Sequence, residues 1–145
     1  MLQDYSSEIL LNTDILLPKH FSVLGNFLID VVQSSSHPAH VKDISTGKYV
    51  FSNQRNVEIF GFQYIEQIIG LTAYDLHVNM PWRDWNVYAT KIVALDNRVK
   101  TEKEAIKDKH MLATSSGLIR DQAVIKFPVL NVTQKPIAIL TFNYD

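Results

Sequence analysis

The spacing of apolar side chains changes along this chain, and the order of those changes most constrains its fold. Two short apolar runs, 39–44 and 48–52, come first and match strands joined by a turn at Gly47. Helical spacing follows, most clearly over 85–99, and after Thr101 the apolar side chains alternate with a period of two. Strands grouped in runs, rather than alternating with helices, favour an antiparallel sheet and an α+β class.

The late elements have clear expected limits. Pro81 suits the first turn of the long helix, and three strands are predicted over 104–113, 118–130 and 136–144. Ile125 and Phe127 belong to the alternating apolar positions of the middle strand, and we expect them to face the long helix.

An amphipathic helix is predicted ahead of the first strand, from about Pro18 to Gln33. Its stripe fits either packing on the domain or pairing with a second copy of the chain. We expect the N-terminal helical segment, residues 1–36, to dimerise. The candidate dimer residues on that stripe are Phe21, Leu24, Leu28 and Val31.

Asn53 stands where the second strand becomes a helix. An Asn there accepts hydrogen bonds from the free amide groups of the first helical turn, which predicts a cap and not a catalytic group. Gly61 is expected to end that helix, because glycine readily adopts the left-handed conformation of a C-terminal cap.

Composition excludes several classes of function. The chain has 145 residues, is 46% hydrophobic, and carries a formal net charge of -1 without a basic patch, so we expect no direct nucleic acid contact. It holds no cysteine, which removes disulfides and thiolate chemistry. No signal peptide or membrane-spanning run is evident, so a cytoplasmic location is expected, although a soluble segment of a larger receptor would look the same.

Residues 37–145 carry an ordered set of short features. They are Val41, Asp43, Gly47, Tyr49 to Phe51 and Asn53, then Gly61-Phe62, Ile68-Ile69-Gly70, Asp75-Leu76, Pro128 and Asp145. In this order and spacing the set resembles the PAS (Per-Arnt-Sim) sensory domain family. The resemblance implies a five-stranded antiparallel sheet with helices on one face, here preceded by the N-terminal amphipathic helix. Within that family the chain most resembles the sensor segment of a bacterial LuxR-type transcriptional regulator, although sensor kinases and cyclic-dinucleotide enzymes carry similar modules.

The resemblance also implies a function. It predicts a homodimeric, non-catalytic sensor that binds a small, largely apolar ligand and regulates an output domain, expected to bind DNA, joined after Asp145. Flavin adduct chemistry is excluded because the family's light sensors need a reactive Cys. Haem is not expected because the long helix offers no His on its stripe, which leaves only His77 and His110 as candidates.

The long helix and the strands that face it should enclose the ligand pocket. Any one of these side chains, and the aromatic ones above all, can equally be plain core, and His77 can equally be a surface residue. The candidate ligand-binding residues are Tyr74, Leu76, His77, Trp85, Tyr88, Ile92, Ile125 and Phe127. No metal site is predicted, since His37 and His40 lack further converging ligands.

Two other hypotheses stay open. A small enzyme or binding cone of the ketosteroid-isomerase or SnoaL-like kind has a similar length, and would use a buried polar pair such as Asp75 and His77. Such a cone places long helices first, whereas a PAS domain places two strands before its central helices. The third hypothesis is a pure interaction module with a filled core. No catalytic residues are predicted.

Overall fold

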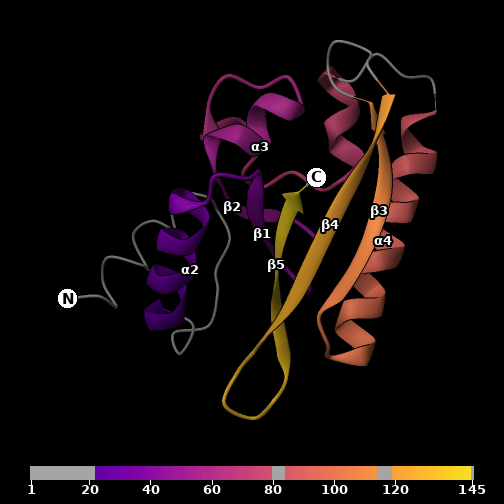
Figure 1. The fold of residues 1–145 in the computed structure, drawn as a ribbon. Coiled ribbons are helices and arrows are strands. Elements are labelled where there is room, and N and C mark those ends of the chain that lie inside the picture. Colours follow the sequence, from indigo (N-terminus) through magenta and orange to yellow (C-terminus); the bar gives the residue numbers. More distant parts are fainter. Residues whose placement is uncertain (1–21, 80–83, 114–118, 145) are drawn as a thin grey trace.

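The computed structural model describes residues 22–79, 84–113 and 119–144 (Figure 1). The candidate dimer residue Phe21 and the expected helix start at Pro81 lie outside these residues, as does Asp145. The elements, in chain order, are helix α2 (Ser22–Ser34), strands β1 (Ala39–Asp43) and β2 (Tyr49–Ser52), helix α3 (Gln54–Ile59), the 3-10 helices η2 (Ile65–Gln67) and η3 (Tyr74–Asn79), helix α4 (Trp85–Glu102), and strands β3 (Ile106–Ala113), β4 (Ile119–Leu130) and β5 (Pro136–Tyr144).

The strands form one antiparallel sheet with the spatial order β2-β1-β5-β4-β3. The predicted five-stranded sheet is therefore confirmed, and β1 pairs with the last strand of the chain. Thr141 on β5 lies opposite His40 on β1 and opposite Lys126 on β4, so these three residues form a row across the sheet. Because side chains directly opposite one another share a face, they all point to the same side.

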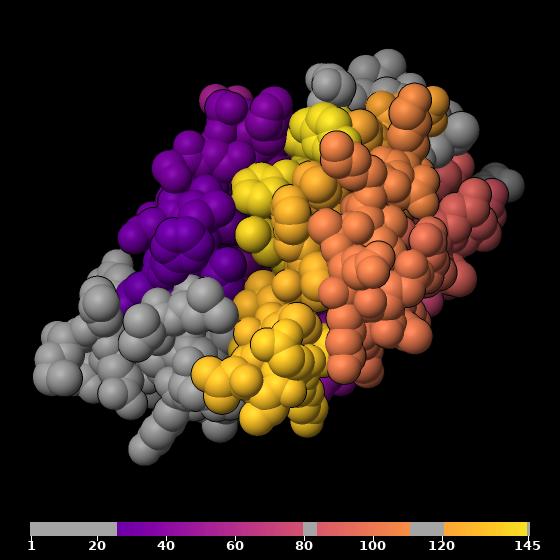
Figure 2. Space-filling model, turned by 60° about the horizontal axis from the view of Figure 1, so that its bottom comes forward, coloured from indigo at the N-terminus to yellow at the C-terminus, as the bar shows by residue number. Residues whose placement is uncertain are grey.

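Helices cover both faces of this sheet. α4 lies over one face and α2 packs on the other, as Figure 1 shows. In the space-filling view, β3, β4 and β5 lie side by side with α2 along their flank (Figure 2). Leu28, Ile29 and Val32 of α2 are buried together with Val41 and Leu140 of the sheet, which removes their apolar area from water.

This packing corrects one expectation about the dimer stripe. Leu28 was predicted to face a second copy, but it is only 6% exposed within its own domain. Val31 is half-buried, and the side chain of Leu24 lies outside the described part of the chain. Phe27, which the sequence did not single out, is 64% exposed on the outer side of α2.

Asn53 is a cap, as predicted, and it also joins four segments. Its Oδ1 accepts hydrogen bonds from the backbone N–H of Asn56 in α3 (3.0 Å) and of Ala39 in β1 (3.1 Å). Its Nδ2 donates to the carbonyl oxygens of Val32 in α2 (3.1 Å) and His37 (2.8 Å). One buried amide therefore fixes the C-terminal turn of α2 and the start of α3 against the same strand.

Candidate functional site

The sheet face under α4 is polar. His40, Lys42, Lys126 and Thr141 are all at most 5% exposed, and all point to this side because of the strand register. Buried polar groups are costly unless they are hydrogen-bonded or paired, so a face of this kind has to be organised by specific contacts. Where the sequence predicted an apolar wall beneath the long helix, a buried polar layer therefore lies beside the apolar side chains of Val124 and Ile139.

Two predicted pocket residues lie on the wrong side of the sheet for contact with α4. Ile125 and Phe127 alternate with Val124 and Lys126, and it is the latter pair that is buried under α4. Phe127 is 36% exposed, and its ring contacts Phe142 edge-on at 6.3 Å. Both faces of the sheet are covered by helices, so an apolar position on β4 does not have to face α4.

An ion triad stands at the centre of the polar layer. Asp96 of α4 accepts from Lys42 Nζ at 2.8 Å and lies 2.7 Å from Lys126 Nζ, so a single carboxylate bridges two ammonium groups. Both lysine side chains are 2% exposed and that of Asp96 is 13% exposed. Lys42 Nζ also lies 5.0 Å from the centroid of the Tyr49 ring, a cation–π contact, and Lys126 donates to Thr141 Oγ1 at 3.2 Å.

The pKa values follow from burial and from this pairing. Burial alone would raise the pKa of Asp96, but Lys126 and Lys42 outweigh it and hold that pKa well below its usual range. Burial lowers the pKa of Lys126 to about 8, against the attraction of Asp96. Burial alone would lower the pKa of Lys42, but the attraction and hydrogen bond of Asp96, together with Tyr49, outweigh it, so this pKa is raised. At pH 7 the triad therefore carries one surplus positive charge.

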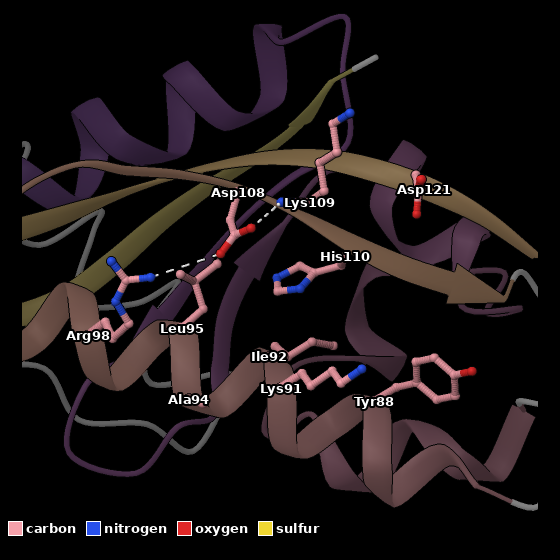
Figure 3. A pocket seen from close by; sticks show the side chains of 10 residues that line it. All are labelled: Tyr88, Lys91, Ile92, Ala94, Leu95, Arg98, Asp108, Lys109, His110 and Asp121. Atoms are coloured by element: carbon pink, nitrogen blue, oxygen red, sulfur yellow. Dashed lines mark hydrogen bonds and ion pairs between the residues drawn. The ribbon is translucent and has the colours of Figure 1, made fainter.

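A groove of about 450 Å³ opens beside this layer, between α4 and strands β3 and β4 (Figure 3). Tyr88, Ile92 and Leu95 of α4 supply its apolar wall, and charged side chains such as Arg98 and Asp108 lie at its rim. This volume is typical of sites for small molecules, and the lining combines one apolar wall with several charged and polar side chains.

His110 is the polar group that points from β3 into the space beneath α4, toward Ile92 (Figure 3). Its Nε2 is buried and, among the described residues, has no hydrogen-bond partner. Burial lowers the pKa of His110 to about 4, with a further contribution from the Lys126 ammonium, so the ring is neutral at pH 7. A neutral imidazole can donate or accept through this nitrogen, depending on its tautomer.

The structure brings together only some of the predicted pocket residues. Tyr88 and Ile92 line the groove, and Tyr74 lines a second cavity beside β1. Leu76 is fully buried core, and Trp85 is 2% exposed and donates its indole N–H to the Ala73 carbonyl at 2.8 Å.

His77 does not reach the groove. It is exposed, and its Nδ1 lies 2.9 Å from the carbonyl oxygen of Tyr74. Asp75 instead accepts from the backbone N–H of Thr72 (2.8 Å) and from its hydroxyl (3.0 Å). The two side chains that would form an acid–base pair in an enzyme are thus engaged in separate local contacts.

The sequence interpretation missed Lys42, Asp96 and Lys126. The burial of Asp96 could have been predicted from the sequence. It follows Ile92 by four residues and precedes Val99 by three, which places it on the buried stripe of the helix. A carboxylate on such a stripe requires a buried cation, but the helix pattern does not say which lysine supplies it.

Neither a metal site nor a membrane span is found in the part of the chain that the structure describes. Over residues 22–79, 84–113 and 119–144 no three His, Asp or Glu side chains gather as metal ligands do. No helix within those ranges has the length and apolar character needed to cross a bilayer.

Comparison with solved structures identifies the fold. The PAS domain of Bordetella pertussis BvgS superposes with a TM-score of 0.68 at 18% identity, covering 83% of this chain and 84% of that one. The chain has the PAS fold. The Vibrio cholerae VqmA dimer, described with LuxR-type receptors, matches with a TM-score of 0.65 at 22% identity, over 81% of this chain. VqmA bound to DPO matches with a TM-score of 0.65 at 21% identity, over 83% of this chain and 56% of that one.

The PAS fold excludes the cone alternative, because two strands precede the central helices. This chain covers 50% of the VqmA dimer structure's chain, so it corresponds to about half of that protein. No protein-family model and no curated protein matches the sequence.

Proposed function

We propose that this PAS domain is a non-catalytic sensor that binds a small molecule in the groove between α4 and strands β3 and β4. The observation that carries this proposal is the buried Nε2 of His110, which has no hydrogen-bond partner among the described residues and lies at a groove of about 450 Å³. A buried polar atom without a partner is costly, and a ligand that hydrogen-bonds to it recovers that cost. The apolar wall formed by Tyr88, Ile92 and Leu95 would hold the rest of the ligand.

The groove favours a ligand with both apolar and polar parts. Its inner wall is apolar, whereas His110 and the charged rim offer hydrogen bonds. This refines the largely apolar ligand that the family resemblance implied. VqmA, which shares the fold, is known bound to DPO, which supports a small-molecule ligand for this domain as well.

We further propose that the domain acts as a homodimer and controls a DNA-binding output domain joined after residue 145. The VqmA dimer and its target DNA support this part of the proposal, and the exposed Phe27 on α2 offers an apolar contact for a second copy. Ligand binding regulates such an output only by favouring one of two arrangements.

Native mass spectrometry of the domain purified without added ligand tests the sensing role, together with a thermal-shift screen of metabolites. We expect a bound molecule, or a metabolite that raises the Tm. His110→Leu should weaken binding about 2- to 10-fold, the value of one hydrogen bond. Ala94→Trp, at an exposed groove position, should abolish binding and leave the fold intact.

His77→Leu is the matched control, since His77 is exposed and lies outside the groove. If no molecule binds, or if His110→Leu and Ala94→Trp bind as the unchanged protein does, the groove is not the sensing site. The pure interaction module would then be the better description.

A further inference from the structure

A second cavity lies on the other side of the ion triad. It has a volume of about 180 Å³ and is lined by residues of β1 and the turn that follows it, of η3 and the segment before it, of α4 and of β5. Both ends of the Lys42–Asp96 ion pair line it, whereas Lys126 and His110 do not. The cavity is therefore separate from the groove, and its polar wall is a buried charged pair.

Lys42 has unused hydrogen-bonding capacity at this cavity. An ammonium group has three N–H donors, and within the described residues Lys42 Nζ gives one hydrogen bond, to Asp96 Oδ2 at 2.8 Å. The Tyr49 ring covers another side of the group at 5.0 Å. Unused donors on a fully buried ammonium are costly, and an acceptor placed in the cavity would satisfy them.

The charge balance around the cavity favours an anion. Asp43 and Asp96 both line it, but the Asp43 carboxylate already accepts from the Ser45 hydroxyl (2.8 Å) and from the Thr46 N–H (3.1 Å) and hydroxyl (2.7 Å). These donors are neutral, so Asp43 keeps its negative charge. Lys42, Lys126 and the exposed Lys100 of α4 carry three positive charges against the two negative charges of Asp43 and Asp96, which leaves one surplus positive charge around the cavity. A monovalent anion beside Lys42 would balance it.

The volume limits the size of that anion. With about 30 Å³ per water molecule, the cavity has room for roughly six groups of that size. We propose that this cavity is a second ligand site, which binds a short-chain carboxylate through Lys42 and prefers it to the corresponding neutral amide. The site goes beyond the sensing groove and does not depend on a ligand being bound there.

Propionate and propionamide form the probe pair, because they have nearly the same shape and differ in charge. Each is titrated into the 15N-labelled domain, and chemical shifts report where it binds. The backbone amides of Thr46 and Ala73 report on this cavity, and those of Lys91 and Lys109 report on the groove. We expect propionate to shift the cavity amides with an affinity about 10-fold or more above that of propionamide, because charge-assisted hydrogen bonds are the stronger ones.

Lys42→Met should remove the propionate response, and it leaves Asp96 paired one-to-one with Lys126. Lys100→Met is the matched control, and it should cause only a smaller, salt-dependent loss because Lys100 is exposed. Thermal unfolding verifies that each variant folds. If Lys42→Met does not fold, the comparison of propionate with propionamide on the unchanged protein still decides.

Equal responses to the two probes, no response to propionate, shifts confined to the groove amides, or an unchanged response in a folded Lys42→Met protein would each overturn this second site. These outcomes are distinct from a failure of the sensing groove. A propionate response at Thr46 and Ala73 supports the second site even if no molecule is found in the groove. A ligand found in the groove likewise supports the sensing role even if propionate causes no response.

Discussion

Replacing Asp96 by Asn tests the ion triad most directly. The side chain keeps its shape but loses its charge, so two lysine side chains that are each 2% exposed are left without a counter-ion. Removing one partner of a buried ion pair typically costs about 3–5 kcal/mol. We expect a loss of that size in the free energy of unfolding at pH 7.

The pKa values set an upper bound on this loss. A lysine that cannot remain charged in the folded state can release its proton, and at pH 7 this costs about 5 kcal/mol for a group with an ordinary pKa of 10.5. Lys126 already bears part of that cost, since burial lowers its pKa to about 8. Most of the additional loss in Asp96→Asn therefore comes from Lys42, whose pKa is raised by Asp96 in the unchanged protein.

The pH dependence gives a second signature. In Asp96→Asn burial acts on both lysines without the attraction of Asp96, so we expect both folded-state pKa values to fall below the unfolded value. The folded state would then bind fewer protons than the unfolded state, and the stability should rise with pH up to about 10.5. In the unchanged protein only Lys126 behaves in this way, and only above about 8. The stability gap between the two proteins should therefore narrow by about 1–3 kcal/mol from about pH 7 to 9.

Urea denaturation followed by tryptophan fluorescence and circular dichroism measures both effects. Asp108→Asn is the control, because its contact with Arg98 is 4.0 Å long and exposed, and surface pairs contribute about 0–1 kcal/mol. A loss below about 1 kcal/mol for Asp96→Asn, without any dependence on pH, would refute the reasoning, because it would mean that water screens the triad. A variant that is unfolded at neutral pH and folds at higher pH would agree with it.

Three further predictions follow from the described contacts. Burial lowers the pKa values of His40 and His110, the latter to about 4. The folded state therefore binds fewer protons than the unfolded state, and the free energy of unfolding should fall as the pH drops below 6.5. His110→Phe should reduce this dependence of stability on pH in acid titrations monitored by circular dichroism. Asn53→Ala removes four hydrogen bonds at a buried junction and should lower the free energy of unfolding by about 2–4 kcal/mol in urea, whereas a loss below about 0.5 kcal/mol would contradict the junction role. Leu28→Asp should unfold the domain, whereas Phe27→Asp should leave its Tm nearly unchanged and weaken any dimer in sedimentation; a folded Leu28→Asp protein would contradict the observed packing.

Local features of the sequence were sufficient for the order of elements. The change from helical spacing to alternation after Thr101 predicted α4 and the three late strands, and the Asn53 side chain predicted the start of α3. These features depend on contacts within a few residues, which the sequence states directly. The combination of turn glycines, Asn53 and the late strands also led to the PAS fold.

The positions of side chains on the sheet depended on tertiary structure. Ile125 and Phe127 were expected to face α4, but α2 covers the opposite face and contributes to the apolar core there. Alternation distinguishes the two faces of a strand without saying which helix will cover each of them. When both faces are covered, the apolar face of a strand no longer identifies the ligand side. The apolar stripe of α2 was equally ambiguous, because it packs on the second face of the sheet and buries Leu28 there.

The sequence by itself therefore determined the five strands, the long helix, their order and the cap at Asn53, because these arise from short-range backbone and side-chain preferences, whereas η3 lies in a segment read as irregular. Only the tertiary structure decided where the charges meet. Lys42 and Asp96 are 54 residues apart in sequence, and they pair because the sheet order places β1 and β4 on either side of β5, beneath α4. A buried charge is tolerated only if the fold places an opposite charge within contact distance, and that placement depends on the tertiary structure as a whole.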